Sequence, residues 1–275
     1  MRPERDNIAA PDLPPAGVWV GDRPESMPAL SAGGPVLVHF LDYSQLNSVR
    51  TLPYLAEWDR RYRDLGLHTI GVQAPRFGFG TDPRFVTAGL ARLGVEFPVV
   101  IDAERELWHA YGCGGWPSLF LWSLGGALAW FHFGEGEYLA TEEAIQAELR
   151  ALNALRVMPA PMEPLRPTDG PGTRVAIPSP EVFPGGSWER AWIAGEDGGE
   201  LAMEYEAGGA YATVEGQGAI ELELDGVSRG PIEVHSPALY GLAEHRRHEQ
   251  HALLLRPTPG MRIWSVSFAA SLPGG

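Results

Sequence analysis

The sequence predicts an α/β domain followed by an all-β domain with a sandwich or jelly-roll arrangement. Strand-like and helix-like patterns alternate over residues 35–156, and short strand-like segments recur over residues 187–275. Between them, residues 157–186 are so rich in Pro and Gly that neither a helix nor an inner strand can persist, which predicts a linker. Residues 1–34 are predicted to be an N-terminal extension. The length of 275 residues suits two domains of ordinary size.

The α/β domain is predicted from segments that alternate between the two periodicities of regular structure. In chain order they are the strand PVLVHFLDY, the helix RTLPYLAEWDRRYRDLG, the strand LHTIGVQAP, the helix DPRFVTAGLARLG, the strand FPVVIDA, the helix ERELWHAYG, the strands WPSLFLWS and GALAWFHFG, and the helix TEEAIQAELRAL. The order β-α-β-α-β-α-β-β-α predicts a mixed sheet covered by helices, and SLGG predicts a hairpin turn between the last two strands.

Two of these helices carry start signals. Asp82 is a plausible N-cap, with Pro83 at the first helical position and Gly94 as a stop signal. For the last helix we expect Thr141 at the N-cap, with Ala144 at N3, so the capping box is incomplete.

The second domain is predicted from strand-like segments that recur at a spacing of roughly 8–12 residues, separated by Gly, Pro and Asp turns. In order they are WERAWIAG, ELAMEYEA, AYATVEG, AIELELDG, PIEVHS, ALYGLAE, HALLLRP and RIWSVSFA. No helical pattern stands out in this half of the sequence.

Composition excludes several classes of function. The net charge of −14 and the absence of a basic stripe argue against a nucleic-acid partner. No uninterrupted apolar run approaches the roughly 20 residues of a membrane span. The first residues, MRPERDNIAAPDLPPAG, lack the apolar core of a secretory signal, so the sequence predicts a cytoplasmic protein. The single cysteine, Cys113, excludes an intramolecular disulfide.

Several motifs between residues 35 and 149 occur in a characteristic order. Tyr43, Ser44, Arg50, Leu52 and Pro53 surround the start of the first helix, and the segments IGVQAP, WHAYGCGGWPSLFLW and HFGEGEY follow. This pattern resembles the thioredoxin-like domains of the TlpA and DipZ type, which are related to the AhpC/TSA proteins. DipZ-like proteins can carry a carbohydrate-binding-module-like β-sandwich after that domain, and they are often extracytoplasmic.

The resemblance places Gln45 and Ser48 where the family has the two cysteines of a Cys-x-x-Cys motif. A helix N-terminus stabilises a thiolate there, so that it can attack a disulfide. Gln45 is neither acidic nor nucleophilic. Ser48 would need a dedicated base, for which His39 is the nearest histidine in sequence, and otherwise it is an ordinary hydroxyl of the helix turn. We therefore expect no dithiol exchange at this site.

Two further residues of this region have two interpretations each. Cys113 is either a buried small hydrophobe or a reactive thiol, although no sequence neighbour lowers its pKa. Pro117 is either a strand-entry proline retained for folding, or a cis-proline. In the second case, as the resemblance implies, Trp116 forms one wall of a peptide-binding groove opposite residues 45–48. The groove residues expected on this basis are Tyr43, Ser44, Arg50, Trp116 and Pro117.

Two polar clusters invite metal or acid-base hypotheses. His245, His248 and His251 in HRRHEQH form either a metal site or, as we favour because of the adjacent arginines, a solvated hairpin. The segment HFGEGEY places a histidine near two glutamates, His132, Glu135 and Glu137, which suits acid-base chemistry, a hard-cation site or, as we favour, a structural role in a Gly-rich turn. We expect no metal ion and no cofactor.

Aromatic side chains of the all-β domain are candidates for stacking on a sugar ring, but alternate strand residues point to opposite faces, so we expect most of them to be core. They are Trp188, Trp192, Tyr205, Tyr211, Tyr240 and Trp264. Taken together, the sequence predicts a redox-inactive binding or scaffold protein for an extended peptide or a glycan. The alternative is a thiol-disulfide oxidoreductase or peroxidase that works through Cys113.

Overall fold

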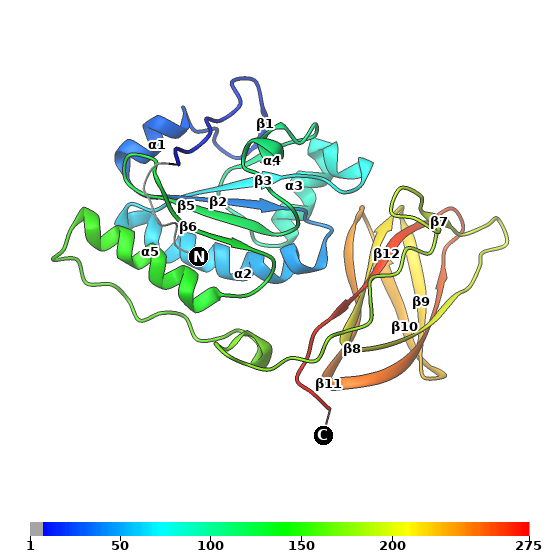
Figure 1. The fold of residues 1–275 in the computed structure, drawn as a ribbon. Helices are drawn as coiled ribbons and strands as arrows, with labels where there is room; N and C mark the ends of the chain where they lie inside the picture. Colours follow the sequence, from blue (N-terminus) through cyan, green and yellow to red (C-terminus); the bar gives the residue numbers. More distant parts are fainter. Residues whose placement is uncertain (1–7, 275) are drawn as a thin grey trace. The chain divides into compact units, whose positions relative to one another are not determined.

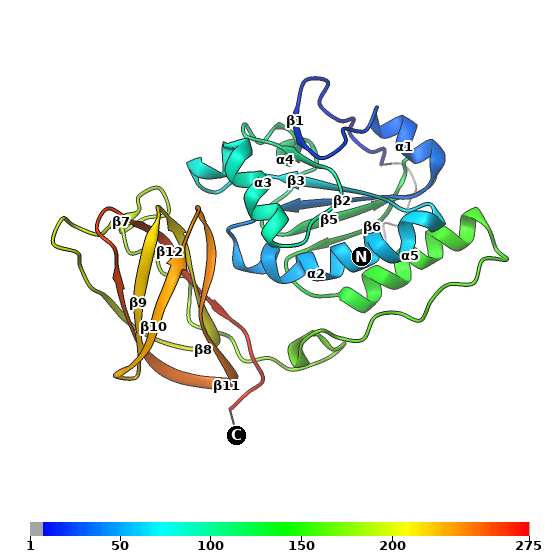
Figure 2. The ribbon, with the colours of Figure 1, turned by 180° about the vertical axis from the view of Figure 1, so that it is seen from behind.

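The computed structural model describes residues 8–274. The chain divides into two compact units, Met1–Pro164 and Leu165–Gly275, and the division falls inside the predicted linker. Each unit has its own sheet and its own buried core, so each is described separately (Figures 1 and 2).

The first unit is built on a six-stranded mixed sheet with the strand order β1-β4-β3-β2-β5-β6. The central strands β2, β3 and β4 are parallel to one another, whereas β5 pairs antiparallel with β2 and with β6. The strands are β1 (Val18–Val20), β2 (Val36–Leu41), β3 (His68–Gln73), β4 (Val99–Ile101), β5 (Ser118–Trp122) and β6 (Leu128–Phe133). The sequence-predicted order of elements from β2 onward is confirmed, and it is that of a thioredoxin-like fold.

Helices cover both faces of this sheet. Figures 1 and 2 show α2 and α5 on one face and α1 and α4 on the other. The helices are α1 (Met27–Gly33), α2 (Leu46–Tyr62), α3 (Pro83–Arg92), α4 (Glu106–Ala110) and α5 (Tyr138–Leu152), with short 3-10 turns η1 (Arg63–Leu65) and η2 (Gly78–Thr81). Because side chains alternate along a strand, Val38 and Phe40 of β2 enter the core on the α1 and α4 side, whereas His39 faces α2 and α5.

The predicted N-terminal extension is partly an element of the sheet. Strand β1 pairs antiparallel with β4 and forms one edge. The Asp12 carboxylate accepts hydrogen bonds from the amides of Leu13 and Met27, both at 2.8 Å, which ties the chain before β1 to the start of α1. A three-residue strand flanked by turns gives too short an alternation for sequence analysis to detect.

One predicted helix start is confirmed and one is corrected. Asp82 caps α3 by accepting a hydrogen bond from the Arg84 amide, and Pro83 opens the helix. Helix α5 starts at Tyr138 after Glu137, not at Thr141. Thr141 lies one turn inside the helix, and its hydroxyl accepts a hydrogen bond from the Trp130 indole at 3.2 Å.

The second unit holds a six-stranded, fully antiparallel sheet with the order β10-β9-β11-β8-β12-β7. Several predicted short strands merge into long ones, because bulges let β8 and β11 continue through register shifts. The strands are β7 (Trp192–Ile193), β8 (Leu201–Glu215), β9 (Gly218–Leu224), β10 (Val227–Val234), β11 (Ala238–Pro257) and β12 (Arg262–Ala269). The all-β class is confirmed, whereas the two separate sheets of a sandwich are not established.

Both ends of the predicted linker are held by the adjacent units. The Met162 amide donates to the buried carboxylate of Glu142 in α5 at 2.8 Å, and Arg61 of α2 donates to the Ala160 carbonyl at 2.9 Å. Further along, the Ser179 amide donates to the Glu206 carbonyl of β8 at 2.9 Å. One short 3-10 turn, η3 (Pro167–Asp169), lies between these anchored stretches.

Candidate functional site

The site predicted at Gln45 and Ser48 lies at the start of α2, where both side chains form hydrogen bonds with backbone amides. Gln45 is the N-cap of the helix, and its Oε1 accepts a hydrogen bond from the Ser48 amide at 2.8 Å. Ser48 is fully buried, and its hydroxyl accepts a hydrogen bond from the Asp42 amide at 3.2 Å. An N-cap oxygen and a buried hydroxyl without a base leave no nucleophile at these two positions.

Hydrogen bonds with buried polar side chains fix the loop before α2. One carboxylate oxygen of Asp42 accepts from the Ser44 amide and hydroxyl, and the other accepts from the Arg76 amide at 2.7 Å. The Tyr43 amide donates to the Gln73 side chain at 3.1 Å. Tyr43 and Ser44 are buried, so the structure places these two expected groove residues in the support of the loop.

Trp116 lies at the same end of the sheet, after the carboxyl ends of β2, β3 and β4. Its indole N–H donates to the Ala74 carbonyl at 2.8 Å, and its ring packs on Trp108 with centroids 4.5 Å apart. The guanidinium carbons of Arg105 and Arg76 lie 5.1 and 5.9 Å from the Trp116 ring centroid. We call the surface formed by Arg76, Arg105 and Trp116 the Trp116 face; ligands of α/β proteins commonly bind at this end of a parallel sheet.

The backbone of Trp116 is available for pairing. The Trp116–Pro117 peptide is cis, and the Pro117 carbonyl accepts from the Gly134 amide at 2.8 Å. Across the described part of the chain, no hydrogen bond engages the backbone N–H or carbonyl of Trp116. A free amide and carbonyl two residues before the first residue of β5 can add an extended segment by backbone hydrogen bonding.

Cys113 is a free, half-buried thiol that packs against the core of the first unit. Burial raises its pKa to about 12. A thiol with such a pKa is protonated at neutral pH and is a poor nucleophile. The geometry therefore argues against the alternative in which Cys113 carries redox chemistry.

Arg50 and the HFGEGEY segment meet across the sequence. The Arg50 Nε lies 2.6 Å from the Glu135 carboxylate, and the Tyr138 hydroxyl donates to the same oxygen at 3.3 Å. Both charged side chains are largely buried, with exposed fractions of 12% and 21%. Glu137 adopts a left-handed conformation with φ 50° just before α5. The contacts of Glu135 join the start of α2 to the start of α5, and Glu137 forms the turn that leads into α5. These positions suit the structural role that we favour for both glutamates.

His39 is a buried histidine that sequence analysis singles out only as the histidine nearest to Ser48. It is fully buried on β2, and no hydrogen bond to either ring nitrogen is formed within the described residues. Burial lowers its pKa to about 3, so it is neutral at pH 7. The Ser48 hydroxyl is engaged with Asp42, so the two residues do not form a nucleophile and base.

The aromatic candidates of the second unit have different surroundings. Tyr205 is buried, and Trp192 and Tyr240 pack against the core cluster. The indole of Trp264 donates to Glu215 at 2.9 Å. Trp188 is exposed, with 49% of its surface accessible, and Tyr211 donates to Glu244 at 3.2 Å. Their proposed role in sugar stacking stays a prediction, and Trp188 is the candidate whose ring is most accessible.

The histidine cluster lies within strand β11, so the expected solvated hairpin is wrong. Between Glu244 and Glu249 the strand shifts register against β8, which stacks the rings of His245 and His251 with centroids 3.7 Å apart. Partner side chains hold the imidazoles: Tyr205 with His245 at 2.8 Å, Asp225 with His251 at 2.7 Å and Glu206 with His248 at 3.3 Å. Throughout residues 8–274, no group of three potential metal ligands has suitable geometry.

The chain is similar to several curated proteins, while no protein-family model matches it. It is 26% identical over 299 aligned residues to DipZ of Mycobacterium bovis, covering 94% of this chain and 42% of DipZ. It is 25% identical over 175 residues to suppressor of quenching 1, a chloroplastic protein of Arabidopsis thaliana, covering 64% of this chain and 16% of that protein. Identity to NHL repeat-containing protein 2 of Gallus gallus is 30% over 135 residues, covering 48% of this chain and 18% of that protein. The chain thus spans less than half the length of these relatives.

Solved structures with similar backbones cover about half of the chain. A thiol-disulfide isomerase from Corynebacterium glutamicum has a TM-score of 0.46 and 21% identity over 53% of this chain and 98% of its own. A DsbE-type thiol:disulfide interchange protein from Chlorobium tepidum has a TM-score of 0.43 and 21% identity over 51% of this chain and 95% of its own. Over residues 8–274 the structure contains no helix long and apolar enough to cross a membrane.

Proposed function

We propose that this chain is a redox-inactive, thioredoxin-like binding module that takes an extended peptide segment at the Trp116 face. The observation that carries the proposal is the use of Gln45 and Ser48 as hydrogen-bond partners of the backbone, at the positions where dithiol chemistry would need two thiols. DipZ of Mycobacterium bovis aligns with 94% of the chain, which supports the choice of thioredoxin-like module.

The Trp116 face supports a peptide ligand for two reasons. The unpaired backbone N–H and carbonyl of Trp116 offer the donor and acceptor that an extended peptide needs. The indole is partly exposed and held in place by Trp108 and by its bond to Ala74, so it presents a rigid apolar surface. Rigid, partly exposed tryptophans are common anchors at protein interfaces.

Peptide binding is tested with a labelled, reduced and carboxymethylated insulin B chain, whose extended conformation and blocked thiols exclude disulfide exchange. Fluorescence anisotropy should show saturable binding to the intact chain. Trp116→Ala should weaken binding by about tenfold or more, as expected for an anchor residue. Trp188→Ala removes an exposed indole of the second unit and should leave the affinity unchanged. Equal affinities of the intact chain and Trp116→Ala would contradict the assignment.

Redox inactivity is tested by insulin reduction with dithiothreitol as the donor. The intact chain should give no turnover above the blank. Gln45→Cys with Ser48→Cys introduces two thiols at the N-cap and N3 of α2, where the side chain of one residue already reaches the amide of the other. That double variant should form an intramolecular disulfide and gain turnover, whereas each single variant should not. A folded double variant without a disulfide would remove the basis for treating α2 as a silenced dithiol site.

For the second unit we propose that its antiparallel sheet folds into a sandwich-like domain. We further propose that this domain contacts carbohydrate through Trp188. Along β8 the buried side chains are first at odd-numbered positions, Tyr205 and Ala207, and after the two glycines at even-numbered positions, Ala210 and Ala212. Such a switch of the buried face is expected where a strand bends between two layers. Trp188 is exposed, and aromatic rings pack on the C–H faces of sugars. Intrinsic fluorescence titrated with cellohexaose should shift for the intact chain but not for Trp188→Ala, and an identical shift in both would refute the contact.

A further inference from the structure

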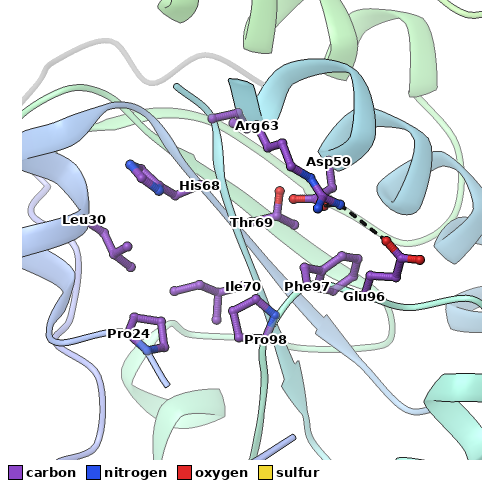
Figure 3. A pocket seen from close by; sticks show the side chains of 11 residues that line it. Pro24, Leu30, Asp59, Arg63, His68, Thr69, Ile70, Glu96, Phe97 and Pro98 are labelled. Carbon is purple, nitrogen blue, oxygen red and sulfur yellow. Dashed lines mark hydrogen bonds and ion pairs between the residues drawn. The ribbon is translucent and has the colours of Figure 1, made fainter. Parts of the chain in front are cut away.

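A pocket of about 230 Å³ lies beside the first half of β3, at the opposite end of that strand from Trp116 (Figure 3). One wall is apolar and consists of side chains from α1, from β3 and from the segment that enters β4, namely Leu30, Ile70, Phe97 and Pro98. The other wall is polar and is formed mainly by Asp59, Arg63, Thr69 and Glu96. Neither Trp116 nor any residue of the α2 N-terminus contributes to the pocket.

The pocket exists because β4 is too short to cover β3. Strand β4 pairs with β3 at Gly71–Gln73 alone, so the first half of β3 has no strand beside it on that side. The amides of His68 and Ala74 donate to carbonyls on the β2 side, whereas the Gly71 amide donates to Pro98 on the β4 side. The backbone N–H groups of a strand point alternately to its two neighbours, so the Thr69 N–H points to the β4 side, as that of Gly71 does. Pairing with β4 begins only at Gly71, so the Thr69 backbone faces the pocket instead of a strand.

The Thr69 side chain is an unsatisfied polar group in the pocket wall. Thr69 is 5% exposed, and no partner within the described residues accepts from or donates to its hydroxyl. Figure 3 shows this hydroxyl on the same side of the pocket as the Asp59 carboxylate. Buried hydroxyls in folded proteins nearly always have a partner, so this hydroxyl in the pocket wall is available to hydrogen-bond a ligand in the pocket.

The charges of the polar wall favour a cation. Arg63 lies 2.5 Å from the Asp59 carboxylate and 3.7 Å from the Glu96 carboxylate, so one guanidinium faces two carboxylates. An anion would compete with both carboxylates for Arg63, whereas an ammonium group finds surplus acceptors. His68 also lines the pocket, and burial lowers its pKa, so at neutral pH it adds no opposing charge.

We propose that this pocket is a binding site for a small amine with an apolar body. The apolar wall contacts the body, and the Thr69 hydroxyl and the carboxylate-rich wall accept hydrogen bonds from the ammonium group. The volume suits one ring with a short substituent, since a cavity of about 150 Å³ already accommodates benzene. The site is separate from the Trp116 face and does not depend on the function proposed for it.

The probes are benzylamine, benzyl alcohol and benzoate, which share one ring and differ in the polar head. Binding to the full chain at pH 7.5 is followed by protein NMR titration. Benzylamine should bind about tenfold or more tightly than benzoate, with benzyl alcohol between them, because hydrogen bonds to charged groups are the stronger ones. Equal affinity for benzylamine and benzoate, tighter binding of benzoate or no saturable shift with benzylamine would overturn the proposal.

Two variants test the pocket wall directly. Thr69→Val keeps the side-chain shape and removes a hydroxyl without a partner, so the fold should stay intact. The affinity for benzylamine should nevertheless fall by about tenfold. Leu30→Trp should fill the pocket and abolish binding, whereas Leu124→Trp at the exposed β5–β6 turn should not affect it. Unchanged benzylamine affinity in Thr69→Val would show that the hydroxyl serves no ligand and would refute the site.

Discussion

His39 makes the first unit sensitive to acid, and His39→Leu should remove that sensitivity. The imidazole is fully buried among the side chains between the sheet and helices α2 and α5, and burial lowers its pKa from 6.5 to about 3. In the unfolded chain the same imidazole takes up a proton below pH 6.5. Between pH 6.5 and pH 3 the unfolded state therefore binds more protons than the folded state, and the free energy of unfolding falls as the pH falls.

The size of the effect follows from the two pKa values. Each pH unit in this window costs about 1.4 kcal/mol, so lowering the pH from 7.5 to 5.0 should cost the intact protein about 2 kcal/mol through His39. Leucine has no titrating group, so the variant lacks this loss. At pH 7.5 the variant should already be more stable by about 1 kcal/mol, because it removes two buried ring nitrogens without partners.

The assay is urea unfolding at pH 7.5, 6.0 and 5.0, monitored by fluorescence of the buried Trp58 and Trp122 in the same unit. The stability gap between His39→Leu and the intact protein should widen by about 2 kcal/mol across this range. The other histidines are present in both proteins, so their contributions cancel. Replacement of the exposed His109 by Leu should leave the gap unchanged. A constant gap for His39→Leu would show that His39 takes up a proton in the folded state and would refute the reasoning.

Three further substitutions or reactions test the first unit. Gly89→Ala should destabilise it by about 2 kcal/mol or more in urea unfolding, because a Cβ there would lie 2.4 Å from the buried Tyr43 ring; a stability within about 0.5 kcal/mol of the intact chain would contradict the packing. Cys113 should react slowly with iodoacetamide at pH 8 and quickly in urea, since burial raises its pKa to about 12, and fast native alkylation would restore the thiol alternative. Glu135→Gln should cost about 1–3 kcal/mol by leaving the largely buried Arg50 without its carboxylate, while an unchanged unfolding midpoint would show the pair to be neutral.

Local patterns were sufficient for most of the first unit. The strand PVLVHFLDY and the cap at Asp82 follow from alternation and capping chemistry within a few residues, and both are observed. The start of α5 was misplaced because Thr141 has the residue type of a cap, and its actual partner, the Trp130 indole, comes from a neighbouring strand. A side chain that can serve either the backbone or a tertiary contact cannot be assigned from its sequence neighbours alone.

In the candidate sites, too, the sequence predicts features that depend on neighbouring residues but not those that depend on contacts between distant segments. The sequence singles out Gln45 and Ser48, but it does not show that their side-chain oxygens accept hydrogen bonds from backbone amides, because that depends on tertiary distances. The pocket beside β3 could not be predicted, because it results from the length of β4 relative to β3. Likewise, the register shift in β11 that stacks His245 on His251 depends on pairing with β8 and has no signal within HRRHEQH.

The hydrogen bond between the Gln45 side chain and the Ser48 amide explains why the observed helix cap and dithiol chemistry exclude each other. A thiolate at a helix N-terminus is stabilised by amides that have no other partner. Here the Ser48 amide is bound to the Gln45 side chain, and the Ser48 hydroxyl is bound to the Asp42 amide. The donors available to an anion at this end of α2 are thus reduced, while the helix gains the stability of a cap, typically about 1 kcal/mol. With Gln45 and Ser48 at these positions, the N-terminus of α2 is closed by side-chain hydrogen bonds, whereas a dithiol site would need it open to stabilise an anion.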